Sequence, residues 1–252
     1  MIVTCQPLAA QQNLEITVAG TQRSARIFVG RQADSVPSPL VLIFHGLGDT
    51  VQNFSTAVDF HDDWPEATVV YPRGQPRSDR DGMNGWHGFR DNDENHDLDF
   101  VDALLKELPR RFKVDPAQVY AAGFSNGGHL TFNLLSDRPC HFAAFGPVGA
   151  LAEYVSHAPV PRPVIYLFGR EEPKEYSDAW QKTVVAIARL NRATGEKREW
   201  ARGLTEFLAG PRGAQTVYGL YSAGHIWPAN GNQFLIRFFK AHRLDSSCGA
   251  AG

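Results

Sequence analysis

The chain has 252 residues, of which 43% are hydrophobic, and a formal net charge of -2 at pH 7. A chain of this length and apolar content can bury a large core as a single domain. The near-neutral charge gives no ground for a nucleic acid or an anionic membrane as partner. No apolar run approaches the roughly 18 residues of a membrane-spanning helix, so we expect no membrane span.

The amino-terminal residues and the cysteines bear on the compartment. Residues 1–7 contain neither a basic segment nor a long apolar segment, so we expect no signal peptide in this chain. This predicts a cytoplasmic protein or the mature form of an exported one. Cys5, Cys140 and Cys248 are odd in number, too few for a disulfide framework, and not at a zinc-site spacing.

The first elements predict a sheet edge followed by a central strand. Residues 14–18 and 26–29 are short β-prone runs on either side of a turn at Gly20, which is typical of an antiparallel hairpin. Residues 40–44 are wholly apolar and predict a buried parallel strand.

The loop after that strand contains His45, Gly46 and Leu47. Ligands bind at the carboxyl ends of strands in open α/β sheets. We therefore expect the backbone N–H of Leu47 to be one donor to a reacting oxyanion. His45 is expected to orient this loop by hydrogen bonding, beside the substrate, rather than to act as a base.

A strand at 68–71 leads into a loop rich in glycine and proline that ends near Trp86. Because the loop leaves the carboxyl end of a strand, it can reach a site there. We expect Trp86 and Trp227 to form an aromatic wall that contacts substrate. Packing inside the protein is the alternative role for both side chains.

The acidic run at 91–102 places oxygen-bearing side chains at the spacing of a calcium loop. However, His96 stands where the sharp turn needs glycine, and Asp102 stands where the bidentate glutamate belongs. A helix start is therefore favoured over calcium binding, with Asp97 or Asp99 at the positive end of a helix over 97–110.

The pentapeptide from Gly123 to Gly127 has the form G-x-S-x-G. It lies between a β-prone run at 118–122 and a helical pattern at 126–136, which is the strand–turn–helix context of a nucleophile elbow. Ser125 is therefore the candidate nucleophile. The N–H of the next residue, Asn126, is the second candidate oxyanion donor.

The acid is expected in the loop after a buried strand at 163–168, which follows another strand at 142–148. A carboxylate there can fix the tautomer of a catalytic histidine. Glu172 is favoured by its position in this loop, Glu171 is the second choice, and Asp178 is the third.

The base is expected to be His225, in a glycine-containing loop near the end of the chain. The order Ser125, Glu172, His225 agrees with the order of one serine-hydrolase fold class and with neither of the other common triad orders. His129 also lies near the serine, but we expect it to point away from this loop.

The remaining elements are helices at 176–193 and 230–241 and a last strand or pair of strands within 197–221. The alternation of strands and helices predicts an α/β fold with a mostly parallel central sheet, helices on both faces and the antiparallel hairpin at the amino end. We expect one domain over 1–245 and a disordered tail at 246–252.

In these motifs the chain resembles the α/β-hydrolases of the polyhydroxybutyrate depolymerase and feruloyl esterase-like group. The matching pieces are His45-Gly46, Gly85-Trp86, Asp97-Leu-Asp99-Phe100, 114–120, 123–128, Phe142-Ala-Ala144 with Pro147-Val148, and 224–228. The family usually has His-Gly-Thr-x-Asp-Pro after the acid strand, whereas this chain has 168–173 as Phe-Gly-Arg-Glu-Glu-Pro; aligned on the glycine and proline, the family aspartate falls on Glu172.

The resemblance implies a serine carboxylic ester hydrolase that works through an acyl-enzyme, without a metal or organic cofactor. Its substrate is expected to be a feruloyl or other aryl ester, or a short hydroxyalkanoate ester, free or attached to a polymer. Residues 45–50 are also similar to acyl-protein thioesterases and small carboxylesterases, which keeps a thioesterase or lysophospholipase-like enzyme as an alternative. A third alternative is a binding protein that has lost activity, favoured by the unusual loop after Phe168.

Overall fold

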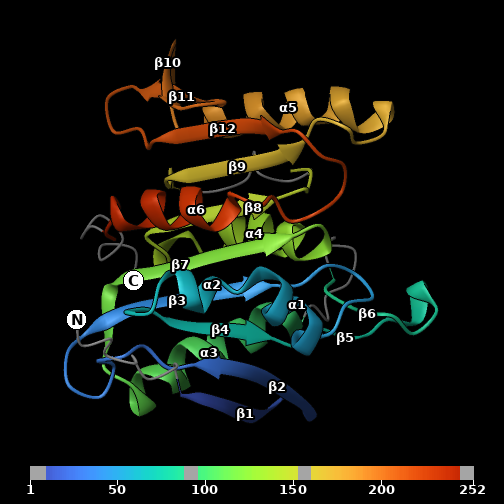
Figure 1. Cartoon of the computed structure of the whole chain (residues 1–252), viewed down its shortest axis with the longest axis vertical. Coiled ribbons are helices and arrows are strands. Elements are labelled where there is room, and N and C mark those ends of the chain that lie inside the picture. Colours follow the sequence, from blue (N-terminus) through green and yellow to red (C-terminus); the bar gives the residue numbers. More distant parts are fainter. Residues whose placement is uncertain (1–9, 88–95, 153–159, 245–252) are drawn as a thin grey trace, which may run out of the picture.

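The computed structural model describes residues 10–87, 96–152 and 160–244. Ten strands in these ranges form one sheet in the order β1-β2-β4-β3-β7-β8-β9-β12-β11-β10 (Figure 1). Their bounds are β1 Gln11–Val18, β2 Thr21–Phe28, β3 Ser38–Phe44, β4 Thr68–Pro72, β7 Val114–Phe124, β8 Ala144–Val148, β9 Val164–Gly169, β10 Ala193–Ala201, β11 Leu204–Ala209 and β12 Thr216–Tyr221. A separate two-stranded sheet pairs β5 Gln75–Pro76 with β6 Asn84–Gly85.

The centre of the large sheet is parallel and its two edges are antiparallel. β4, β3, β7, β8, β9 and β12 run parallel to one another, whereas β2 joins β4 and β11 joins β12 in antiparallel register. The central strands are buried on both faces because they are short continuous apolar runs, as parallel strands covered on both sides require. The predicted mostly parallel α/β sheet is confirmed.

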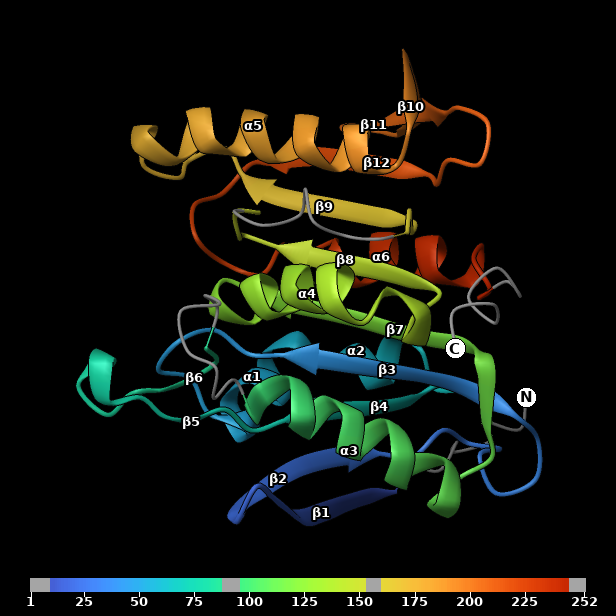
Figure 2. The ribbon, with the colours of Figure 1, turned by 180° about the vertical axis from the view of Figure 1, so that it is seen from behind.

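Helices cover both faces of the sheet. α1 Val51–Val58, α2 Phe60–Asp63 and α6 Gly231–Lys240 lie on the face seen in Figure 1, and α3 His96–Arg111, α4 Asn126–Asp137 and α5 Lys174–Leu190 lie on the face seen in Figure 2. Each face has its own apolar cluster, one containing Phe44 and Phe145 and the other Ile43 and Tyr120. Side chains alternate between the faces along each strand, so neighbouring residues contribute to different clusters.

The amino-terminal hairpin is confirmed, with Val18 paired to Thr21 across the turn. The two helices α1 and α2 were missing from the sequence prediction. The expectation of one or two strands within 197–221 was wrong in number, because β10, β11 and β12 form three antiparallel-linked strands there. β10 is almost entirely exposed and polar, so it lacks the apolar pattern that marks a strand.

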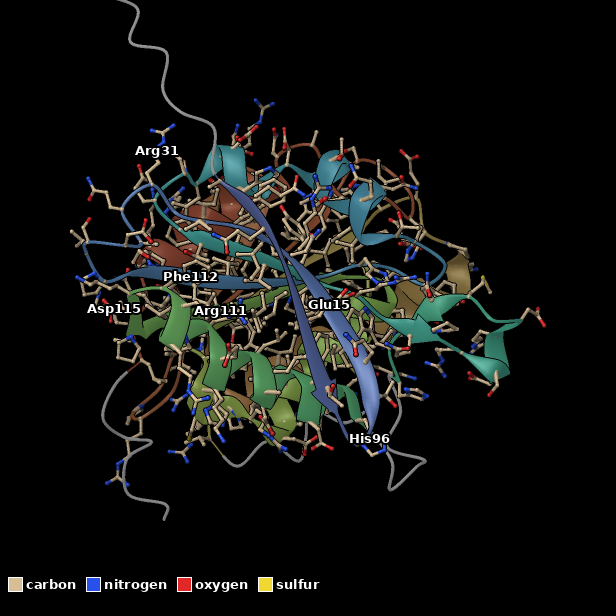
Figure 3. All side chains as sticks on the ribbon, turned by 90° about the horizontal axis from the view of Figure 1, so that it is seen from below. Glu15, Arg31, His96, Arg111, Phe112 and Asp115 are labelled. Carbon is tan, nitrogen blue, oxygen red and sulfur yellow. The ribbon has the colours of Figure 1, made fainter. Side chains whose placement is uncertain are left out.

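The hairpin is fastened to α3 by a buried ion pair. The guanidinium of Arg23 lies 2.7 Å from the carboxylate of Asp97, and both side chains are 2% exposed. Figure 3 looks onto this edge and shows the hairpin and α3 side by side, with His96 near the start of the helix. Asp97 thus lies in the first helical turn, as expected, but its carboxylate pairs across to β2.

Three expectations fall wholly or partly outside the described residues. They are the tail at 246–252, the first half of the acidic run at 91–102, and two of the three cysteines. Cys140, the third, is disulfide-bonded, which the number of cysteines gave no reason to expect. Within the ranges that the structure describes, no helix combines the length and the apolar character needed to cross a membrane.

Candidate active site

Ser125 occupies a strained turn between β7 and α4. Its backbone has φ 53° and ψ -118°, a conformation that residues with a side chain rarely adopt. The turn is tight because its glycines leave room for neighbouring backbone: a Cβ on Gly123 would collide with Gly127, and one on Gly127 would collide with the carbonyl of Phe44. The nucleophile-elbow geometry follows from this spacing of glycines around the serine.

Ser125, His225 and Glu172 form one line of hydrogen bonds. The Oγ of Ser125 lies 2.7 Å from Nε2 of His225, and Nδ1 of His225 lies 2.6 Å from Oε1 of Glu172. A carboxylate only accepts, so Nδ1–H donates to Glu172 and Nε2 is left to accept from the serine hydroxyl. The Glu172 side chain is 5% exposed, whereas that of His225 is 46% exposed.

The loops that carry Glu172 and His225 are joined by backbone hydrogen bonds. The N–H of Arg170 donates to the carbonyl of Tyr221 at 2.9 Å, and the N–H of Glu171 donates to the carbonyl of Ala223 at 3.1 Å. The side chain of Glu171 is exposed. Of the three carboxylates considered from the sequence, Glu172 is therefore the one that the fold brings to His225.

His45 is buried inside the neighbouring loop. Its Nε2 accepts from the N–H of Gly74 at 3.0 Å, so Nδ1 carries the proton and donates to the carbonyl of Gly46 at 2.7 Å. Burial lowers the pKa of His45, which keeps the ring neutral. With 1% exposure, His45 does not contact substrate, and the expectation that it would is corrected; its hydrogen bonds do hold the loop.

The orientation of the peptide group between Gly46 and Leu47 determines where the N–H of Leu47 points. In a trans peptide the carbonyl of Gly46 and the N–H of Leu47 point in opposite directions, so the N–H of Leu47 points away from His45. Asn126 is the first residue of α4, where backbone N–H groups have no acceptor in the helix. Within the described ranges, no protein acceptor takes either N–H.

The expected aromatic wall is wrong for Trp86. Its side chain is fully buried, and its indole N–H donates to the carbonyl of His45 at 2.9 Å. Its backbone is also held, because the side-chain amide of Asn126 accepts from the N–H at 2.6 Å and donates to the carbonyl at 2.9 Å. Trp86 is therefore a buried packing residue that is hydrogen-bonded to His45 and Asn126.

Trp227 is half-buried and also serves packing. Its indole N–H donates to Asn232 at 2.9 Å, and its ring meets Phe54 edge-on with 5.9 Å between centroids. It does not line the cavity at Ser125. Both indole N–H groups thus have partners within the protein, which the sequence pattern does not reveal.

The cavity at Ser125 has a volume of about 310 Å³. Its lining residues are Ser125, His129, Gly149, Ala150, Leu151, Phe168, Glu172, Pro173, Tyr176 and His225. Leu151, Phe168 and Tyr176 are the large aliphatic and aromatic residues of this lining. These residues could not be assigned to the site from the sequence.

His129 was expected to point away from the His225 loop, yet it lines this cavity. Burial lowers the pKa of His129 to about 4, against a hydrogen bond to the carbonyl of Leu151, so the ring is neutral near pH 7. The sequence spacing of His129 could have indicated this position, because a residue four positions after Ser125 lies about one helical turn from it on the same face of the helix.

One group of side chains in the described ranges could hold a metal ion, namely Asp59, His61 and Asp62 at the junction of α1 and α2. Nδ1 of His61 is hydrogen-bonded to the hydroxyl of Tyr71. The group includes none of the residues that line the cavity at Ser125.

Residues 19–202 match the model of the Esterase family, described as "Putative esterase". The chain is 27% identical over 262 residues to "Putative esterase NocK" of Nocardia uniformis subsp. tsuyamanensis, covering 85% of this chain and 73% of that protein. It is 29% identical over 138 residues to a bifunctional acetylxylan esterase/xylanase of Neocallimastix patriciarum, covering 54% of this chain and 19% of that one. The family match spans most of the chain, so the protein belongs to the esterase family.

Solved structures of esterases share the fold. An acetyl xylan esterase from Aspergillus awamori superposes with a TM-score of 0.69 at 14% identity, covering 91% of this chain and 99% of that chain. A ferulic acid esterase superposes with a TM-score of 0.64 at 12% identity, covering 92% and 97%. At this identity the likeness establishes the α/β-hydrolase fold.

Proposed function

We propose that this member of the esterase family is a serine carboxylic ester hydrolase with Ser125 as nucleophile, His225 as base and Glu172 as acid. The observation that carries the proposal is the line of two hydrogen bonds, 2.6 Å and 2.7 Å long, that joins Glu172 to His225 and His225 to Ser125. A serine hydroxyl is a weak nucleophile unless an adjacent base takes its proton. Here the base is in contact, and a buried carboxylate orients it.

The reaction runs in two halves. Oγ of Ser125 attacks the ester carbonyl carbon while Nε2 of His225 takes the hydroxyl proton; the tetrahedral intermediate then collapses, and His225 protonates the departing alcohol oxygen. Water next gives a proton to His225 and attacks the acyl-enzyme. The carboxylic acid leaves and Oγ regains its proton. Glu172 stabilises the imidazolium in both halves.

The oxyanion of each intermediate is held by the N–H groups of Leu47 and Asn126. The hydrogen bond from His45 to the carbonyl of Gly46 leaves the Leu47 N–H pointing away from His45, and the start of α4 leaves the Asn126 N–H without an acceptor in the helix. Removing one such donor typically reduces kcat by about 10² to 10³. The buried network around His45 supports this assignment because it fixes the loop before substrate binds.

Aryl esters of the feruloyl type are the first substrate class, followed by short hydroxyalkanoate esters. Phe168, Tyr176 and Leu151 give the cavity an aromatic and apolar wall next to the nucleophile. Acetyl xylan and ferulic acid esterases among the structural neighbours add support through their names. A catalytically inactive protein is disfavoured, since its one sequence argument was the unusual acid loop, and Glu172 of that loop reaches His225.

Replacement of Ser125 by alanine tests the proposal. The variant removes one hydroxyl, so the melting temperature should stay close to that of the wild type. Release of 4-nitrophenol from 4-nitrophenyl acetate and labelling by a fluorophosphonate should both disappear. Labelling that persists in Ser125→Ala would sink the assignment of the nucleophile.

A further inference from the structure

A second cavity, of about 650 Å³, opens beside the loop that carries His225. Tyr221 and Ile226 from the two ends of this loop line it, and it shares no lining residue with the cavity at Ser125. The hydroxyl of Tyr221 donates to the carbonyl of Ile226 at 2.7 Å, which closes the loop on itself. A ligand in this groove would therefore touch the segment that holds the catalytic histidine.

The floor of the groove is apolar. Leu204 of β11 and Phe234 of α6 line it and belong to the same apolar cluster, and Ile226 is 54% exposed at its rim. Gly219 leaves the space that Leu204 occupies, because a Cβ there would collide with the leucine side chain. Such a floor suits an aliphatic or aromatic group.

Two arginines stand on opposite sides of this floor. β12 lies between β9 and β11 (Figure 1), so Arg170, which follows β9, and Arg202, in the turn before β11, flank it. Arg170 is anchored by its backbone bond to Tyr221, and the turn at Arg202 is set by Gly203 with φ +83°. Neighbouring strands are about 4.8 Å apart, so the two main chains are about 10 Å apart, a span that two arginine side chains can bridge.

The charge of these arginines is not neutralised by the protein. No Asp or Glu lines the groove in the part of the chain that the structure describes, and neither Arg170 nor Arg202 has an ion pair there. By contrast, Arg198 on the neighbouring strand β10 is paired with Glu206 at 2.7 Å. Two guanidinium groups that lack a carboxylate partner and flank an apolar floor match a ligand in which an apolar group ends in a carboxylate.

We propose that this groove binds an apolar group ending in a carboxylate. The inference rests on the proposed ester hydrolysis, because that reaction offers two sources of such a ligand. One source is the acid that the acyl-enzyme releases, and the other is a second carboxylate on the substrate. Both would be held by Arg170 and Arg202, with the hydrocarbon part on Leu204 and Phe234.

Direct binding tests the groove without turnover. In Ser125→Ala protein, calorimetric titration with 4-phenylbutyrate should give saturable binding, and the further changes Arg170→Gln and Arg202→Gln together should weaken it about tenfold. The neutral 4-phenylbutyramide should bind weakly and equally to both proteins. The matched control is Arg31→Gln, an exposed arginine six strands away at the β2 end of the sheet (Figure 3). Equal affinity for 4-phenylbutyrate in the double variant would overturn the proposal.

Kinetics with serine-intact protein separates the two sources. If the released acid is the ligand, 4-phenylbutyrate inhibits the hydrolysis of 4-nitrophenyl acetate, and the double variant relieves that inhibition. If a second carboxylate is the ligand, the double variant raises KM for the 4-nitrophenyl monoester of glutarate but not for 4-nitrophenyl pentanoate. Unchanged inhibition together with unchanged KM overturns the proposal. An inactive wild type that still binds 4-phenylbutyrate through the arginines would instead defeat the proposed esterase.

Discussion

At the scale of single residues, the proposed active site combines a buried carboxylate with an exposed imidazole. The carboxylate of Glu172 is 5% exposed behind the half-exposed ring of His225. A buried carboxylate is costly unless it is hydrogen-bonded, and His225 supplies the partner. The pair therefore fixes the ring so that Nε2 faces the serine.

Replacement of Glu172 by glutamine should cripple turnover. The amide keeps the size of the side chain but can neither stabilise the imidazolium nor enforce the tautomer, so kcat should fall by roughly 10² to 10⁴. Glu171→Gln is the matched control on the same loop, and its exposed side chain predicts less than about a tenfold change. Steady-state kinetics of both variants, with melting curves, decides. Near-normal kcat in Glu172→Gln together with a large loss of kcat in Glu171→Gln would show that Glu171, not Glu172, is the acid.

Asn126 is predicted to position the oxyanion hole through its side chain. Its amide bonds both backbone groups of Trp86, while its own N–H is a proposed oxyanion donor. Asn126→Ala keeps that N–H but releases the side chain, so kcat should fall roughly tenfold with KM within about twofold. Asn84→Ala, on β6 nearby, is the control. A rise in KM with kcat unchanged would contradict a role in positioning.

At the scale of elements, the apolar pattern of the sequence and the order of its predicted strands and helices correctly predicted most of the central sheet. Residues 40–44 and 163–168 are continuous apolar runs that only a strand buried on both faces explains. α1 was missed because it is short and starts at an ordinary threonine cap, and β10 was missed because nearly all of it is exposed. The threonine cap of α1 is a common local signal on a short helix and β10 lacks an apolar pattern, so tertiary contacts decide both elements.

The site could be predicted as far as local geometry determines it. The contact between Ser125 and His225 could be anticipated because an elbow and a late loop histidine have sequence signatures. The burial of Trp86 and His45 could not be foreseen, since it depends on the hydrogen bond between residues 41 positions apart. The groove with Arg170 and Arg202 was also invisible, because three strands must assemble before it exists.

Gly169 is predicted to hold the acid and base loops together. A Cβ at this position would lie 2.5 Å from the carbonyl oxygen of Gly224 and 2.7 Å from that of Ala223. Both are backbone atoms, so relieving the clash requires the main chain to move. Gly169→Ala should therefore push the loops apart, lower kcat/KM by more than about tenfold and destabilise the fold by about 1–3 kcal/mol. Gly224→Ala on the facing loop is the control, because its Cβ would meet only the carbonyl oxygen of Glu171, at 3.6 Å. Equal activity of the two variants would contradict this account.

At the scale of the whole molecule, the sheet collects residues from distant parts of the chain. Ser125 follows β7, Glu172 follows β9 and His225 follows β12, and these strands are separated in the sheet only by β8. All three run parallel, so their carboxyl ends meet at one edge. The amino-terminal hairpin lies at the far end of this sheet, where β2 pairs with β4 and a buried ion pair joins the hairpin to α3.

Acid should weaken the buried ion pair of Arg23 and Asp97. Burial pushes the pKa of Asp97 upward, but hydrogen bonds from His87 and the charge of Arg23 outweigh it, so the pKa lies below the usual 3.8. A lowered folded-state pKa contributes stability that is present above the unfolded value and is lost as pH falls through the folded value. The pair therefore stabilises the fold at pH 7 and stops doing so in strong acid.

Asp97→Asn should lower the free energy of unfolding at pH 7 by about 3–5 kcal/mol, because it leaves the guanidinium of Arg23 buried without its charge partner. The difference from the wild type should shrink as pH falls from 3.8 toward the lower folded-state pKa, because the carboxyl of the unfolded chain then binds a proton that folding must release. Urea unfolding from pH 7 down to pH 2 measures both effects. Asp99→Asn, whose side chain is 55% exposed in the same helical turn, should change stability by less than about 0.5 kcal/mol at every pH. A loss in Asp97→Asn that is independent of pH would show that packing, rather than the charge of Asp97, fastens the hairpin to α3.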